Sequence, residues 1–275
     1  MGTRPVEVGG GWWRLVKVAG LVGVSGGLLA TARPPLTSTT STVLHQPPPT
    51  DIHSEYVKFP SGRDTITAYL AYPERKDPAP AVVVIHEIFG MSDFVRQTTE
   101  QLAKDGFVAI APDLLSRRGG TPPSSDDARK LIAGLDPDTL TKDLDATVAY
   151  VKRIKAARPD RVGVIGFCWG GGQSFRYATN NPSLGAFVVC YGPSPEATSI
   201  ARLRAKGLGV YAENDARINA GLADVDAAIR TYHKTFRHTV YPGVGHGFLR
   251  SREKPEVADS AWRAIVGFFR ENLER

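Results

Sequence analysis

From about residue 51 onward, hydrophobic and polar positions follow two patterns, one typical of β-strands and one typical of helices. In residues 55–59 and 65–72 polar and apolar side chains alternate, which is typical of a half-exposed β-hairpin. Further strands are predicted at 81–86 (AVVVIH), 107–111, 161–167 (RVGVIGF), 186–191, 208–211 and 237–241. Helices are predicted at 94–104, 140–157, 170–179, 223–232 and 256–272, and a polar surface loop at 117–127.

This succession of strands and helices determines the expected fold class. When buried strands alternate with amphipathic helices, the strands pair in parallel and the helices cover the sheet. We therefore expect one α/β domain with a mainly parallel central sheet that is flanked by helices on both faces. The sequence shows no internal repeat with a period of about 20–50 residues.

The first fifty residues differ from the rest of the chain. Arg14 and Lys17 precede an uncharged stretch, 18–30, which ends in the small-x-small pattern Ala30-Thr31-Ala32. We expect residues 1–32 to be a signal peptide, because a spanning helix needs about 20 apolar residues. The alternatives are a membrane anchor and a wrongly assigned start codon before a cytoplasmic enzyme.

Residues 33–50 are rich in Ser, Thr and Pro and are predicted to be a disordered tether. This division leaves 51–275 as the folded α/β domain. The expected location is secreted or periplasmic, with no stable membrane insertion once the signal has been cleaved.

Composition narrows the possible functions. Hydrophobic residues make up 42% of the chain and charged residues 23%, as in ordinary soluble domains. The net charge of +6 falls to +4 if cleavage after Ala32 removes three basic residues and one acidic residue. No dense basic block with interleaved aromatic residues is present, so we expect no nucleic-acid partner. Two cysteines are too few for a disulfide scaffold or a four-cysteine zinc site.

The strongest chemical motif is Gly166-Phe167-Cys168-Trp169-Gly170, at the junction of a predicted strand and helix. A G-x-nucleophile-x-G turn of this kind raises its central side chain above the end of a sheet. A thiol at a helix N-terminus is expected to ionise more easily than usual. The alternative reading is a tight turn that carries an inert, buried cysteine.

Two further residues complete a possible triad in the order nucleophile, acid, histidine. Asp215 and His246 each follow a predicted strand, and His246 has glycine on both sides. Both residues are expected at the carboxyl edge of the sheet, where such sheets bind their ligands. Glu213 is the rival candidate for the acid.

Together these residues resemble the dienelactone hydrolases, or carboxymethylenebutenolidases, of the α/β-hydrolase superfamily. The resemblance covers about residues 55–272. It rests on four segments, which are HEIFG at 86–90, APDL at 111–114, GFCWGG at 166–171 and GHGFLR at 245–250.

The resemblance implies an α/β-hydrolase fold and a triad of Cys168, His246 and Asp215, with a thioester intermediate on the cysteine. It also implies that Glu87 contacts the resting thiol and helps to generate the thiolate when substrate arrives. The backbone N–H groups of Ile88 and Trp169 would form the oxyanion hole.

The resemblance further suggests that Arg250 pairs with a substrate carboxylate, since a guanidinium binds a carboxylate through two parallel hydrogen bonds. The alternative is an exposed arginine at the start of a loop. Family members use a second arginine, for which Arg117, Arg118 and Arg129 are candidates that spacing does not separate. Arg129 is taken as the expectation. No metal and no organic cofactor is expected.

The leading hypothesis is therefore a hydrolase of carboxylic ester bonds that cleaves lactones or small esters and prefers anionic substrates. The first alternative is a broad-specificity esterase or thioesterase in which Arg250 is structural. The second is a non-catalytic α/β-hydrolase module that binds a ligand. The expected partner is a small ester or lactone, and we expect a monomer.

Overall fold

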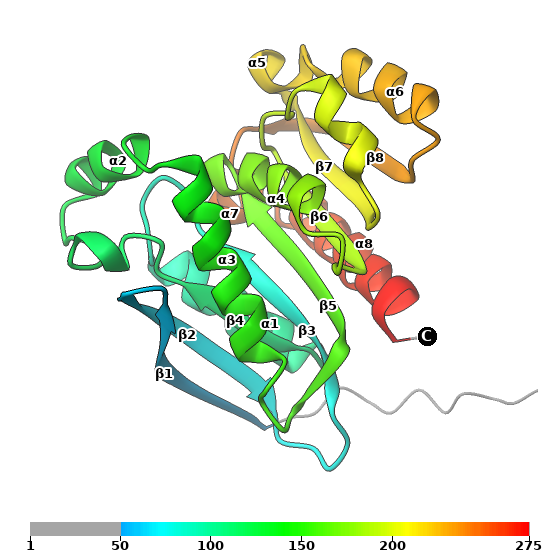
Figure 1. Ribbon diagram of the computed structural model, residues 1–275. Helices are drawn as coiled ribbons and strands as arrows, with labels where there is room; N and C mark the ends of the chain where they lie inside the picture. Colours follow the sequence, from blue (N-terminus) through cyan, green and yellow to red (C-terminus); the bar gives the residue numbers. More distant parts are fainter. Residues whose placement is uncertain (1–50, 275) are drawn as a thin grey trace, which may run out of the picture. The chain divides into compact units, whose positions relative to one another are not determined.

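An eight-stranded sheet forms the centre of the computed structural model, which describes residues 51–274 (Figure 1). Its strands are β1 Ile52–Ser61, β2 Asp64–Pro73, β3 Ala79–Ile85, β4 Val108–Pro112, β5 Ala157–Phe167, β6 Ala186–Cys190, β7 Lys206–Asn214 and β8 Phe236–Gly245. They lie side by side in the order β1-β2-β4-β3-β5-β6-β7-β8.

The predicted hairpin and the predicted parallel pairing of the later strands are both confirmed. β1 and β2 form an antiparallel hairpin, and its turn contains Gly62 with a left-handed φ of 65°. β2 also pairs antiparallel with β4, whereas every pair from β4 to β8 is parallel. The sheet is therefore mainly parallel, with one antiparallel edge.

Helices connect the parallel strands, and two more follow the last strand. They are α1 Asp93–Lys104, α2 Ser125–Ala133, α3 Pro137–Val151, α4 Trp169–Asn180, α5 Ala216–Asn219, α6 Leu222–Thr231, α7 Phe248–Ser251 and α8 Pro255–Leu273. Two short 3₁₀ helices, η1 Ser116–Arg118 and η2 Ala197–Arg202, lie in the connections after β4 and β6.

The central strand β3 is apolar throughout because helices cover both of its faces. Val83 and Ile85 pack into one hydrophobic cluster with residues of α3, α4 and α6. Val82 and Val84 pack into a second cluster with residues of α1 and α8. Because neighbouring strand residues point to opposite faces, a strand covered on both faces needs apolar residues at every position. The helices therefore cover both faces of the sheet, as predicted.

The largest departures from the predicted boundaries lie at the end of α3 and in the loop before α2. The helix expected over 140–157 ends at Val151, because Ala157 already pairs with Ala79 at the start of β5. The expected loop at 117–127 contains η1 and the first turn of α2. Ser124 caps α2 by accepting the N–H of Asp127, so part of this polar stretch is a helix start rather than a loop.

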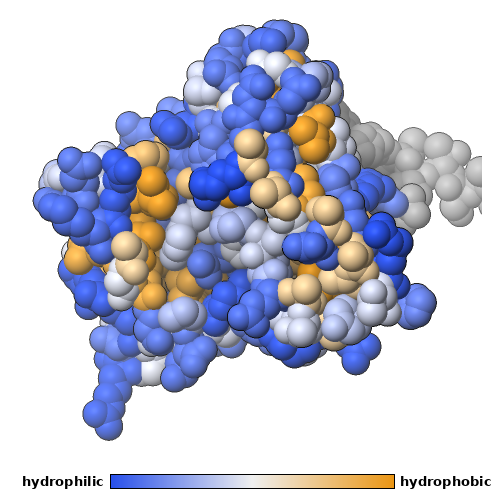
Figure 2. Space-filling model, turned by 90° about the horizontal axis from the view of Figure 1, so that it is seen from above, coloured by the Kyte–Doolittle hydropathy of each residue, from blue (hydrophilic) through white to orange (hydrophobic). Residues whose placement is uncertain are grey.

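The predicted signal peptide and tether lie outside the described residues. Between residues 51 and 274, none of the helices is long and apolar enough to cross a membrane. Seen from above, the surface carries small hydrophobic patches that are separated by hydrophilic residues (Figure 2).

Candidate active site

Four residues predicted to act in catalysis lie on loops at one edge of the sheet. Parallel strands end at the same edge, which is the upper edge in Figure 1. Glu87 follows β3, Cys168 follows β5, Asp215 follows β7, and His246 follows β8. Positions separated by up to 159 residues in the sequence are thus brought together by the order of the strands.

The turn between β5 and α4 holds Cys168 in a strained conformation, with φ 55° and ψ −120°. Its glycines are required by close backbone contacts. A β-carbon at Gly166 would lie 1.9 Å from the carbonyl oxygen of Gly170, and one at Gly170 would lie 2.3 Å from that of His86. The chain therefore turns as tightly as a nucleophile elbow requires.

Cys168, His246 and Asp215 form one chain of contacts. The Nε2 atom of His246 lies 3.1 Å from the Cys168 sulfur, and its Nδ1 atom lies 2.5 Å from a carboxylate oxygen of Asp215. Asp215 is buried, with a side-chain exposure of 7%. The rival acid Glu213 instead accepts the backbone N–H of Gly243, so the structure places Asp215 and not Glu213 beside the imidazole.

Two aromatic residues that sequence reasoning missed support these loops. Tyr191 is fully buried, and its ring packs edge-on against His246 with the centroids 5.2 Å apart. Its φ of 39° is unusual for a tyrosine and comes directly after β6. Nothing in the local sequence indicates this conformation, since Tyr191 reads as the last residue of a buried strand.

His86 is the second residue that was missed. Its Nδ1 atom lies 2.8 Å from the carbonyl oxygen of Glu87, and its Nε2 atom accepts the N–H of Leu114 at 3.3 Å. The ring stacks on Trp169. Burial lowers the pKa of His86 and keeps the ring neutral, so this histidine holds the Glu87 loop in place.

Glu87 and Arg250 form an ion pair at the site. The Nε atom of Arg250 lies 3.0 Å from Oε2 of Glu87, and the guanidinium also lies over the ring of Phe89. Oε2 of Glu87 has no hydrogen bond of good geometry within the described part of the chain. Burial raises the pKa of Glu87 to about 7, and the positive charge of Arg250 opposes this rise.

The cysteine differs from the expectation that it would ionise easily. Burial raises the pKa of the Cys168 thiol, and the nearby charge of Glu87 raises it further. The backbone N–H of Trp169 and the charges of Arg217 and Arg250 act in the opposite direction. Desolvation therefore outweighs the favourable position at the start of α4, and the pKa of the resting thiol is higher than that of a free cysteine.

Glu87 is close enough to affect the thiol through its charge, but it makes no hydrogen bond to Cys168 among the contacts of residues 51–274. The hydrogen-bond partner of the thiol is His246. The carboxylate of Glu87 pairs instead with Arg250, and the expected contact between Glu87 and the resting thiol stays a prediction.

The proposed oxyanion donors flank this cluster. Trp169 is the first residue of α4, so its N–H has no partner in the preceding turn of the helix. Ile88 follows Glu87 on the loop after β3. The two N–H groups belong to neighbouring strand ends, because β3 pairs directly with β5.

Arg117, one candidate for a second substrate-binding arginine, has another role. Its guanidinium bonds to both carboxylate oxygens of Asp143, at 2.8–3.1 Å, and to the carbonyl oxygen of Ser61. It also pairs with Asp64. Because Asp143 is 3% exposed, Arg117 balances a buried carboxylate.

Arg118 and Arg129 lie elsewhere on the surface. Arg118 donates to the carbonyl oxygen of Gly134 at the end of α2. Arg129 lies on α2, where it is 56% exposed and pairs with Asp126 one turn away at 3.5 Å. Among the contacts of the described residues 51–274, none joins Arg118 or Arg129 to Cys168.

The matching family model, described as the dienelactone hydrolase family, covers residues 66–273. The chain is 32% identical to the "Putative carboxymethylenebutenolidase" of Methylorubrum extorquens over 211 residues, which is 70% of this chain and 72% of that protein. It is 33% identical to a protein of the same name from Synechocystis, over 71% of this chain and 87% of the relative.

A solved structure gives the same assignment. The "Putative Dienelactone Hydrolase" of Klebsiella pneumoniae superposes with a TM-score of 0.74 at 30% identity, over 80% of this chain and 98% of that one. The α/β-hydrolase fold expected from the motifs is therefore confirmed. On this evidence the chain belongs to the dienelactone hydrolase family and is a hydrolase of ester or lactone bonds.

Proposed function

We propose that the protein cleaves lactones or small esters with an anionic group, using Cys168 as nucleophile, His246 as base and Asp215 as its orienting acid. The observation that carries the proposal is the unbroken chain from the Cys168 sulfur through His246 to Asp215. A buried carboxylate on Nδ1 fixes the tautomer of the imidazole, which leaves Nε2 to accept the thiol proton.

In the first half of the reaction, His246 takes the proton from Cys168, and the thiolate attacks the carbonyl carbon of the substrate. The carbonyl oxygen becomes an oxyanion, which the N–H groups of Ile88 and Trp169 stabilise. One such donor typically contributes about 3 kcal/mol to lowering the barrier. Collapse of this intermediate expels the alcohol, which takes the proton from His246, and leaves an acyl thioester on Cys168.

In the second half, His246 takes a proton from water, and the resulting hydroxide attacks the thioester carbonyl. The same two N–H groups stabilise the second oxyanion. Collapse returns the proton to the Cys168 sulfur and releases the carboxylic acid. No step in this sequence calls on a metal or an organic cofactor.

Glu87 and Arg250 link substrate binding to activation of the thiol. A substrate carboxylate competes with Glu87 for the guanidinium of Arg250. Once it loses this cation, Glu87 has an even higher pKa, since Arg250 is the charge that lowers its pKa. Glu87 then takes up a proton from solvent, and the proton of the Cys168 thiol still goes to His246. The negative charge that disfavours the thiolate then disappears. In this proposal an anionic substrate activates the nucleophile.

The test compares hydrolysis of a dienelactone, a neutral nitrophenyl acetate and an acetyl thioester by the wild type and three variants. We expect Cys168→Ala to lose all turnover. Arg250→Ala should lower kcat/KM for the dienelactone by about tenfold to hundredfold, the effect of one charged hydrogen-bonded pair, and should spare the neutral ester. Arg230→Ala, an exposed arginine on α6, is the control.

Each other outcome points to a different function. If the wild type and Arg250→Ala hydrolyse neutral esters equally and neither opens the dienelactone, the protein is a broad-specificity esterase or thioesterase. If no substrate shows turnover that depends on Cys168, the catalytic proposal is wrong and a ligand-binding role is the better account.

A further inference from the structure

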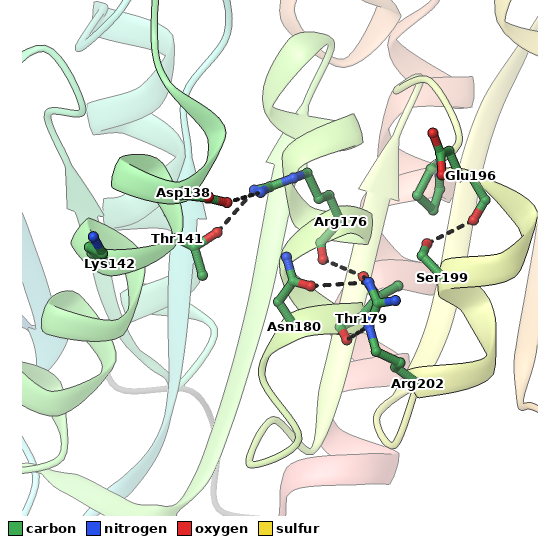
Figure 3. Close-up of a pocket in the computed structure, with 10 residues that line it drawn as sticks. Asp138, Thr141, Lys142, Arg176, Thr179, Asn180, Glu196, Ser199 and Arg202 are labelled. Carbon is green, nitrogen blue, oxygen red and sulfur yellow. Dashed lines mark hydrogen bonds and ion pairs between the residues drawn. The ribbon is translucent and has the colours of Figure 1, made fainter.

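A cavity of about 760 Å³ lies between α3, α4 and η2, and polar or charged residues supply most of its lining (Figure 3). None of these residues belongs to the candidate active site. The volume of the cavity lies within the range of about 300–1,000 Å³ that is typical of small-molecule sites. It faces away from the sheet, because it is formed by two helices and a 3₁₀ turn that cover the same hydrophobic cluster. The proposed hydrolysis assigns no role to it.

Arg202 forms one wall and is held in place by neutral groups. Its Nε donates to the carbonyl oxygen of Thr179, and its Nη2 lies 3.3 Å from the side-chain oxygen of Asn180. These acceptors orient the guanidinium against the end of α4 without neutralising its charge (Figure 3). The same hydrogen bonds stabilise the end of α4, so Arg202 has a structural role as well.

Arg176 reaches from α4 toward α3 on the opposite side (Figure 3). Its Nη1 donates to the hydroxyl of Thr141 at 3.0 Å, and its Nη2 lies 3.6 Å from Asp138. The Asp138 carboxylate is 88% exposed and therefore well hydrated, so this pair offsets little of the arginine's charge. Lys142, exposed on α3, adds a third cation to the lining.

The charge balance of the lining limits what can bind. Three cations face two carboxylates, Asp138 and Glu196, which leaves one positive charge in excess. A ligand with several anionic groups would be repelled by the carboxylates, whereas a ligand with one anionic group and several hydroxyls satisfies both kinds of residue. None of the lining residues is aromatic, so the cavity offers no stacking surface for a nucleobase.

The neutral polar side chains of the lining can form hydrogen bonds with the hydroxyl groups of a ligand. Ser199 donates its own proton to the carbonyl oxygen of Glu196 at 2.7 Å and so presents an oxygen that can accept hydrogen bonds. The hydroxyl of Thr141 is already engaged, because it donates to a backbone carbonyl oxygen and accepts from Arg176. The side-chain oxygen of Asn180 faces Arg202, which leaves its NH₂ group as a donor. Carboxylates, hydroxyls and an amide together form the mixed donor and acceptor set that sugar hydroxyls require.

We infer that this cavity binds an acidic sugar, meaning a polyhydroxylated ring with a single carboxylate or phosphate group, and that Arg176 and Lys142 receive its anionic group. No residue is shared between this cavity and the candidate active site.

The test is titration calorimetry of the full chain with glucuronate, glucose 6-phosphate, neutral glucose and inorganic phosphate. We expect saturable binding with one site per chain for at least one acidic sugar, and weaker binding of glucose and of phosphate. Arg176→Ala and Lys142→Ala should each weaken the acidic sugar about tenfold, which corresponds to the loss of one charge-assisted contact. Which of the two sugars binds more tightly identifies the anionic group.

Two control variants locate the binding site. Arg263→Ala, an exposed arginine on α8, should leave the affinity unchanged. Arg250→Ala should also leave it unchanged, whereas a loss there would place the sugar at the candidate active site and overturn the inference. Equal affinity of inorganic phosphate and glucose 6-phosphate, no saturable binding of either sugar, or unchanged affinity in Arg176→Ala would overturn it as well.

Discussion

Replacing Glu87 with glutamine is expected to stabilise the folded protein at alkaline pH. Glu87 is 2% exposed, and burial raises its pKa from 4.5 to about 7. A carboxyl with a raised pKa in the folded state contributes most to stability below pH 4.5 and loses that contribution as the pH rises toward 7. Above pH 7 the folded protein must hold an ionised carboxylate in a site that favours the neutral acid.

The size of the effect follows from the linkage of 1.36 kcal/mol per pH unit. Ionisation of Glu87 lowers the free energy of unfolding by about 1 kcal/mol at pH 5 and by about 3 kcal/mol at pH 8. Glutamine has nearly the same shape and no charge, so Glu87→Gln removes this loss. Any pH-independent cost of the new amide cancels when its effects at the two pH values are compared.

The assay is urea unfolding of the wild type and Glu87→Gln at pH 5 and pH 8 under reducing conditions. The gain from the substitution should be larger at pH 8 by about 2 kcal/mol, a shift of about 1 M in the midpoint. Glu271→Gln, at an exposed ion pair on α8, should show no such difference. Parallel pH dependence in the wild type and Glu87→Gln would refute the reasoning that Glu87 is held partly protonated.

Three further predictions concern the triad, a structural arginine and the start of the chain. Asp215→Asn should lower kcat by about 10³–10⁴-fold, because the imidazole of His246 can then adopt the wrong tautomer. Glu213→Gln should retain activity, and equal losses in the two variants would contradict the assignment of the acid. Arg117→Ala should lower the free energy of unfolding by about 3 kcal/mol, because it leaves the carboxylate of Asp143 buried without its cation. kcat/KM should stay unchanged, and a loss of activity on anionic substrates alone would instead identify Arg117 as a substrate ligand. Mass spectrometry of exported protein should find a new N-terminus after Ala32, and an intact N-terminus on a membrane-bound protein would favour the anchor.

The sequence predicts most of the fold because the β-branched runs are unambiguous. A run such as AVVVIH fits only a strand with apolar neighbours on both faces, and β3 has them. Helix α2 was missed because its exposed first turn, Ser125 to Asp127, has the same composition as a polar loop. The end of α3 was misplaced because pairing of Ala157 with Ala79 is a long-range contact that local periodicity does not reveal.

At the candidate site, the sequence motifs predict which residues come together but not how deeply they are buried or which side chains contact them. The order of Cys168, Asp215 and His246 was enough to expect them at one edge of the sheet. The raised pKa of the thiol was not foreseen, because burial depends on side chains from several distant strands and helices. The role of Arg117 could not be predicted for the same reason, since Asp143 reaches it from another helix.

The tight contacts around Cys168 also determine where the enzyme can change in evolution or in the laboratory. Substitution is blocked at Gly166 and Gly170 by backbone atoms, which cannot move aside as a flexible side chain could. Position 168 already accommodates a β-carbon, so serine fits there with the same backbone. The scaffold therefore constrains the turn and not the attacking atom. Variants that change Cys168 alone, with both glycines and the buried Phe167 kept, should remain folded and test new chemistry on the same backbone.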